Sequence, residues 1–176
     1  MRIQTLSECV DWLEVHKFQF DEPNVSAGRG GFVYLPVEGH RRLFHAPADG
    51  WTQTLLSYQL TKWVGAFEAL LWITDWSLYE QKEMELFDSY RQLHEEHRRL
   101  IDTPGYLLDT SQEADAWVLT ENIHLMLSFN WQGFVMRSDK SAIIWLADGM
   151  IETFTGSHEQ DEYLQKIADA CGIVSQ

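Results

Sequence analysis

The chain has 176 residues, and its 27 acidic and 13 basic residues give it a formal net charge of −14. Eight tryptophans, nine phenylalanines and six tyrosines exclude a disordered acidic tail, because aromatic side chains of this number supply a large core. The length suits one globular domain over residues 1–176. The negative charge excludes direct binding to nucleic acid and favours a basic protein as partner.

The sequence has no apolar run of the roughly 18 residues that a membrane-spanning helix needs. Its first residues show no apolar leader, so we expect no membrane contact and a cytoplasmic protein. Cys9 and Cys171 lie on apolar faces of predicted helices, where free thiols act as small hydrophobic groups. Reduced cysteines are therefore expected.

The first predicted elements are a helix and a β-hairpin. Thr5 followed by Glu8 forms a capping box, which is typical of a helix start. The β-rich runs 32–37 and 41–45 are short and close together, so they are expected to pair as a hairpin. Pro36 has no N–H to donate, which predicts an edge position for the first strand of this hairpin.

A second helix is predicted from Asp49 to Val64, with Gly65 as its stop. Its apolar stripe is expected to consist of Trp51, Leu55, Tyr58 and Trp63. The run 67–74 is apolar at both odd and even positions, which indicates a strand with both faces covered.

Two further helices are predicted in the middle of the chain. Ser77 with Glu80 is a capping box, and apolar residues recur at helical spacing as far as Leu100. Thr110 with Glu113 is another box. The helix that it opens is apolar nearly all round, so deep burial is expected for Trp117, Val118, Leu119, Ile123 and Met126.

The range 133–155 predicts a three-stranded meander, because two short turns divide it into three β-rich runs. Its middle run, 141–147, is apolar at both parities and should be flanked by a strand on each side. Ser157 with Gln160 opens the last helix. The whole pattern predicts an α+β fold with a mainly antiparallel sheet of five to six strands and about five helices.

The sequence predicts no catalytic residue, no metal site and no cofactor. His94 and His97 are spaced i and i+3 and are followed by two arginines, a pattern that differs from the zinc-binding HExxH motif. The glycine-rich run 27–31 leads into a β-rich segment, whereas a phosphate-binding loop leads into a helix. These patterns favour a solvated helix face and a plain loop.

The preferred hypothesis is a non-enzymatic binding protein, such as an inhibitor or immunity-type protein, that binds a basic protein partner. The acidic C-terminal part supplies the expected partner surface, consisting of Asp148, Glu152, Glu159, Asp161 and Glu162. Two alternatives stay open. One is a small hydrolase, with or without a metal at His94 and His97, and the other is a small-molecule sensor with an aromatic-lined pocket.

Overall fold

The computed structural model describes residues 1–23, 31–77, 81–92 and 96–173. Seven strands form one antiparallel sheet in the order β1-β6-β5-β7-β8-β9-β4. These strands are β1 (Arg2–Gln4), β4 (His40–His45), β5 (Glu68–Asp75), β6 (Gly105–Asp109), β7 (Gln132–Arg137), β8 (Ala142–Ala147) and β9 (Met150–Thr155). A separate pair consists of β2 (Phe20–Asp21) and β3 (Phe32–Val33).

Five helices accompany the sheets in the described residues, so the predicted α+β class is confirmed, with seven strands in the main sheet where five to six were expected. The helices are α1 (Leu6–Val15), α2 (Gly50–Val64), α3 (Gln81–Gln92), α4 (Glu113–Phe129) and α5 (His158–Ala170), with a short 3-10 turn, η2 (Leu100–Asp102). None of them is long and apolar enough to cross a membrane.

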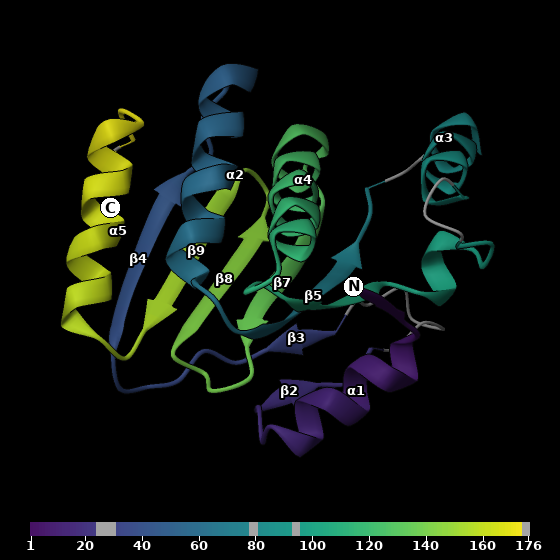
Figure 1. Ribbon diagram of the computed structural model, residues 1–176, viewed down its shortest axis with the longest axis horizontal. Helices are drawn as coiled ribbons and strands as arrows, with labels where there is room; N and C mark the ends of the chain where they lie inside the picture. The colour runs from purple at the N-terminus through teal and green to yellow at the C-terminus, as the bar shows by residue number, and fades with distance from the viewer. Residues whose placement is uncertain (24–30, 78–80, 93–95, 174–176) are drawn as a thin grey trace.

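The main sheet has a different cover on each face (Figure 1). Helices α2, α4 and α5 pack on one face around a helix-side core, to which the sheet contributes Leu71 and Ile144. Helix α1 and the β2–β3 pair cover the other face around an α1-side core, to which it contributes Trp72 and Phe134. Adjacent residues of one strand point to opposite faces, so both cores draw on the same strands.

The predicted meander is confirmed by β7, β8 and β9, which pair in sequence order. Strand β8 lies between its two neighbours, with Trp145 opposite Phe134 on one side and Glu152 on the other. The apolar strand predicted at 67–74 is also confirmed, as β5. It pairs with β6 and β7, and its alternate side chains pack in the two cores on opposite faces of the sheet, which explains why it is apolar at both parities.

Local signals also placed several helix starts correctly. Thr5 and Glu8 form the reciprocal capping box of α1. The side chain of Asp49 accepts a hydrogen bond from the backbone N–H of Thr52 at the start of α2. The Ser157 hydroxyl accepts one from the N–H of Gln160 in α5.

The predicted hairpin of 32–37 with 41–45 is wrong. The first run contributes only β3, which pairs with β2, whereas β4 pairs with β9 over six residues. This longer ladder satisfies more backbone groups than a partner containing Pro36 could, because proline has no N–H. Strand β3 has one partner in its two-stranded sheet, and β4 lies at an edge of the main sheet.

The predicted continuous helix from Ser77 to Leu100 is also wrong. Helix α3 ends at Gln92, and η2 begins at Leu100. Residue Glu80 of the expected capping box lies outside the described residues, as do residues 27–30 of the glycine-rich run. The segment after η2 contains strand β6, which the sequence pattern did not predict and which extends the sheet.

The contact between β7 and β5 predicts a strict requirement for glycine at position 133. A Cβ atom there would lie 2.4 Å from the carbonyl oxygen of Trp72 and 2.9 Å from the Cα atom of Ile73. These are backbone atoms of a central strand and cannot turn aside. We expect Gly133→Ala to lower the free energy of unfolding by about 1–3 kcal/mol, measured by urea denaturation.

Gly156→Ala is the matched control, because nothing lies within 4 Å of the Cβ atom that it would add. It should change the free energy of unfolding by less than about 0.5 kcal/mol. Equal stability of the two variants would contradict the close approach of β7 and β5.

Candidate functional site

A groove of about 360 Å³ lies between the C-terminal half of α2 and the N-terminal half of α4. Both helices pack on the helix-side core, so the groove opens on the side of the helices that faces away from the sheet. Its lining residues come from α2, from the turn after it and from the start of α4: Tyr58, Thr61, Lys62, Gly65, Ala66, Thr110, Glu113, Ala116, Trp117 and Thr120. We call this the α2–α4 groove.

Two aromatic rings form one rim of the α2–α4 groove. The rings of Tyr58 and Trp117 lie with centroids 6.0 Å apart and an interplanar angle of 27°. Their exposed fractions are 37% and 51%, which are large values for such side chains. The ammonium group of Lys62 lies 4.4 Å from the centroid of Tyr58, within the range of a cation–π interaction. Tyr58 raises the pKa of this ammonium group.

Threonine hydroxyls form the floor of the groove, and all of them are hydrogen-bonded. Thr120 donates to the hydroxyl of Thr61, which donates to the carbonyl of Ser57. The hydroxyl of Thr110 accepts from the N–H of Phe67. Thr110 was predicted to cap α4, but the N-cap is Gln112. The floor is therefore polar yet satisfied, with its hydroxyls engaged in structural contacts.

The sequence pattern predicted that Tyr58 and Trp117 lie in the core, and this prediction is wrong. Helix α2 buries the stripe of Leu56, Leu60, Trp63 and Val64, leaving Trp51 and Tyr58 outside. At 100° per residue, Tyr58 and Trp63 lie about 140° apart around the helix, so they cannot share one narrow stripe. That angle was readable from the sequence and would have indicated a second, outward apolar stripe.

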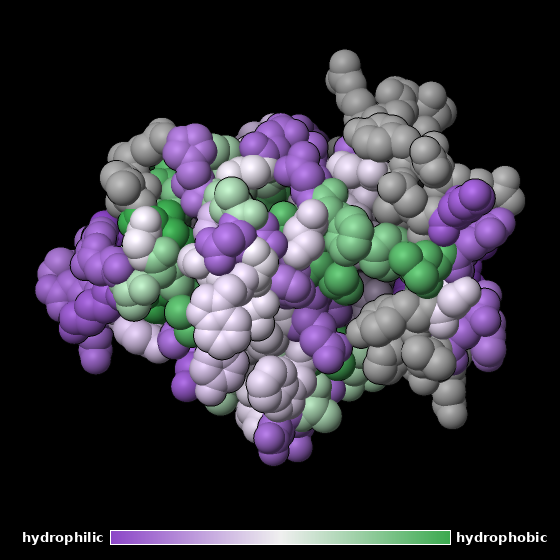
Figure 2. All heavy atoms as spheres, turned by 90° about the horizontal axis from the view of Figure 1, so that it is seen from above, coloured by the Kyte–Doolittle hydropathy of each residue, from purple (hydrophilic) through white to green (hydrophobic). Residues whose placement is uncertain are grey.

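The same applies to α4, where Trp117 is half exposed although Leu119, Ile123 and Met126 are fully buried. Figure 2 shows the molecule from above, and pale side chains of intermediate hydropathy gather where α2 and α4 lie in Figure 1. Green, hydrophobic side chains lie further toward the α3 side. The helix side of the molecule therefore presents apolar and aromatic groups to solvent despite the high net charge.

The five carboxylates of the predicted partner surface do not share one face. Asp148 lies in the turn before β9, whereas α5 begins after the end of β9, roughly 20 Å along the strand. Glu152 has the same parity as Phe154, which packs in the α1-side core, so it points away from the face that α5 covers.

The three predicted carboxylates of α5 also differ from one another. Glu159 and Glu162 are exposed, but Asp161 is buried and paired with Arg42 of β4. The Nε and Nη2 atoms of Arg42 donate to the two oxygens of Asp161 over 2.6 and 2.7 Å. This bidentate contact holds the pKa of Asp161 below its ordinary value. Asp161 therefore joins α5 to the edge strand.

The described residues offer little for nucleophilic or helix-borne metal chemistry. Burial raises the pKa of Cys9 to about 12 and also raises that of Cys171, so neither thiol is activated. His94 lies outside the described residues. His97 is exposed and follows the end of α3, so the described structure holds no helix that carries both histidines.

Comparison with known proteins adds no functional assignment. No protein-family model, no curated protein and no solved structure matches the chain.

The pair of Asp161 and Arg42 generates a stability prediction. Asp161→Asn should lower the free energy of unfolding at pH 7 by about 1.5–3 kcal/mol, the usual worth of a hydrogen bond to a charged group. Glu162→Gln, one position along α5 and exposed, should change it by less than about 0.5 kcal/mol. Urea denaturation measures both values, and equal losses would contradict a structural role for Asp161.

The pH dependence of this loss has a definite sign. The pKa of Asp161 is lowered in the folded state, so its contribution is complete above the ordinary carboxyl value of 3.8. It disappears as the pH falls through the lower folded-state value. The difference between the wild type and Asp161→Asn should therefore shrink when the same denaturation is repeated in strong acid.

Proposed function

We propose that this chain is a non-enzymatic binding protein that holds a lysine or arginine side chain of a basic protein partner in the α2–α4 groove. The observation that carries the proposal is the half-exposed ring of Trp117 stacked beside Tyr58 at the rim of a cavity of about 360 Å³. Tryptophan, tyrosine and arginine dominate the energetic centres of protein interfaces.

Aromatic rings suit a cationic side chain for two reasons. The face of each ring attracts a positive charge, and the ring also covers the aliphatic part of a long side chain. Lys62 already places its ammonium group over Tyr58. In our proposal this contact is an intramolecular version of the one that the partner makes, and the partner's cation replaces it.

Acidic charge favours the same class of partner. Glu113 lines the groove and is exposed. The whole chain carries a net charge of −14, which accelerates the approach of a basic protein. Glu159 and Glu162, members of the predicted partner surface, enter the proposal as distant charges that attract the partner and not as direct contacts.

A small-molecule sensor is the second candidate, and the groove volume favours it. A cavity of about 360 Å³ lies near the lower end of the range for small-ligand sites. Its aromatic rim and Glu113 suit a small organic cation. Titration with an alkylamine separates the two functions, because a sensor should bind the free amine as tightly as the same amine within a peptide.

The proposal is tested with synthetic peptides rich in lysine and arginine and with acidic peptides of equal length. The basic peptides should bind, as measured by fluorescence anisotropy. Trp117→Ala should weaken that binding at least about fivefold, the effect of losing about 1 kcal/mol.

Trp51→Ala is the matched control for this experiment. Its indole is even more exposed, at 79%, but lies about two helical turns before Tyr58 and does not line the groove. This variant should bind like the wild type. Equal binding of acidic peptides, or an equal loss in both tryptophan variants, would refute the proposal.

Removal of the positive charge of Lys62 should change the affinity for basic peptides in the opposite direction, toward tighter binding. Lys62→Met keeps an unbranched side chain but replaces its charged end by an apolar one. The substitution therefore frees the face of Tyr58 and removes a positive charge from the groove. The affinity for the basic peptides should increase about two- to fivefold, because an exposed cation–π contact is worth about 0.5–1 kcal/mol. Lys166→Met, on the exposed side of α5, is the control. Weaker binding after Lys62→Met would show that Lys62 assists the partner.

A further inference from the structure

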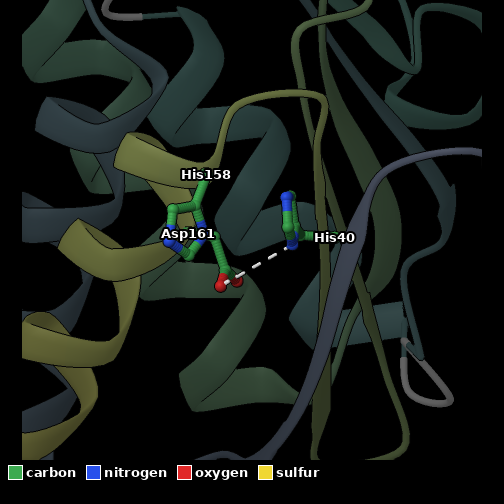
Figure 3. A group of neighbouring side chains, drawn as sticks. All are labelled: His40, His158 and Asp161. Atoms are coloured by element: carbon green, nitrogen blue, oxygen red, sulfur yellow. Dashed lines mark ion pairs between the residues drawn. The ribbon is translucent and has the colours of Figure 1, made fainter.

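A second group of functional side chains lies at the other edge of the helix layer, where β4 meets α5. His40 begins β4, His158 begins α5 and Asp161 follows one turn later on the same side of that helix. Figure 3 shows the imidazole rings on either side of the carboxylate, in the gap between the edge strand and the helix. His40 is more than a hundred residues away from His158 and Asp161 in the sequence, so only the fold brings it to the other two.

The donor atoms of these three residues lie close to one another. Within the described part of the chain, one nitrogen of each histidine and one oxygen of Asp161 lie within 4.8 Å of one another. The Nδ1 atom of His40 is 3.9 Å from Oδ2 of Asp161, and the two imidazole centroids are 5.4 Å apart. We propose that His40, His158 and Asp161 form a binding site for a divalent transition-metal ion, of which Zn²⁺ is the best-suited example.

Both the donor types and their spacing fit such an ion. Zinc takes imidazole nitrogen and carboxylate oxygen at about 2.0–2.2 Å, which puts tetrahedral donors roughly 3.3–3.6 Å apart. The three donors therefore have to approach one another by at most roughly 1.5 Å. The side chains of His40 and His158 are 41% and 74% exposed, so both rings have room to turn inward.

The carboxylate is already fixed in position. Arg42 donates to both oxygens of Asp161, and an ionised carboxylate has further lone pairs on each oxygen. Hydrogen bonds of this kind orient the ligands of natural metal sites. Glu162 also places Oε1 3.4 Å from Nε2 of His158, as do the carboxylates that orient metal-bound imidazoles elsewhere.

Arg42 contacts Asp161 and opposes a cation at the site, but the carboxylates of the described residues outweigh its charge. Asp161 and Glu162 contact the cluster directly, and the charge of Asp169 acts on Arg42 from the same helix. The local balance is therefore negative before an ion arrives. The ion would fasten an edge strand to the start of the last helix, a function independent of the α2–α4 groove.

The test uses the chain without a histidine tag, freed of metal by a chelator and titrated with ZnCl₂ in a calorimeter. One ion per chain should bind. His40→Ala and His158→Ala should each weaken the binding at least about tenfold. Both positions are solvent-exposed enough for the variants to fold, which circular dichroism verifies.

His97→Ala is the matched control, because His97 is exposed and lies outside the cluster. It should bind zinc like the wild type. Titration with Co²⁺ adds a second measurement, since a visible absorption band should appear in the wild type and in His97→Ala but be lost in His40→Ala. Absence of zinc binding, or an equal loss in His97→Ala, would overturn the proposal.

Discussion

The whole structure depends on the need to cover both faces of one wide sheet. Strands β5, β7 and β8 are apolar at odd and even positions alike, so neither face can be left in water. Leu70 and Trp72 of β5 point toward α1, whereas Leu71 and Ile73 point toward the helix layer. This single constraint explains why the chain places helices on one side and α1 with a small strand pair on the other.

The helix layer has a consequence for the surface. Each helix on a sheet can bury only one stripe, so any second apolar stripe on the same helix faces solvent. Helix α2 carries such a second stripe with Trp51 and Tyr58, and Tyr58 meets the exposed Trp117 of α4 where the two helices lie side by side. The core cluster on this side of the sheet does not include these two rings, and for this reason the proposed function assigns them to binding.

The fold also changes the meaning of the acidic composition. A count of carboxylates suggests one negative surface, but Asp161 is neutralised by Arg42, and Glu152 and Asp148 lie away from the start of α5. The chain as a whole still has a net charge of −14, and the electric field of this charge acts over a long range. In the proposed function, the specific contacts with the partner come from shape and aromatic chemistry, which the α2–α4 groove combines.

The sequence by itself determined the elements whose signals are local. Three kinds of element depend only on residues close together in the chain. They are the helix starts at Thr5, Asp49 and Ser157, the two short turns of the meander, and strand β5 with apolar residues on both faces. The α+β class followed from the order of these elements. These features were predictable because backbone hydrogen bonding and turn geometry are satisfied within a few residues.

Only the tertiary structure decided the pairing of β4 with β9, the addition of β6 to the sheet and the location of both candidate sites. Helical periodicity shows that a stripe is apolar but not whether another element covers it, so Trp117 and Tyr58 were assigned to the core. The proposed metal cluster joins His40 of β4 to His158 and Asp161 of α5, and no local spacing relates the strand residue to the helix pair. Strand pairing and burial are choices among distant partners, and their free energies depend on the complete set of contacts.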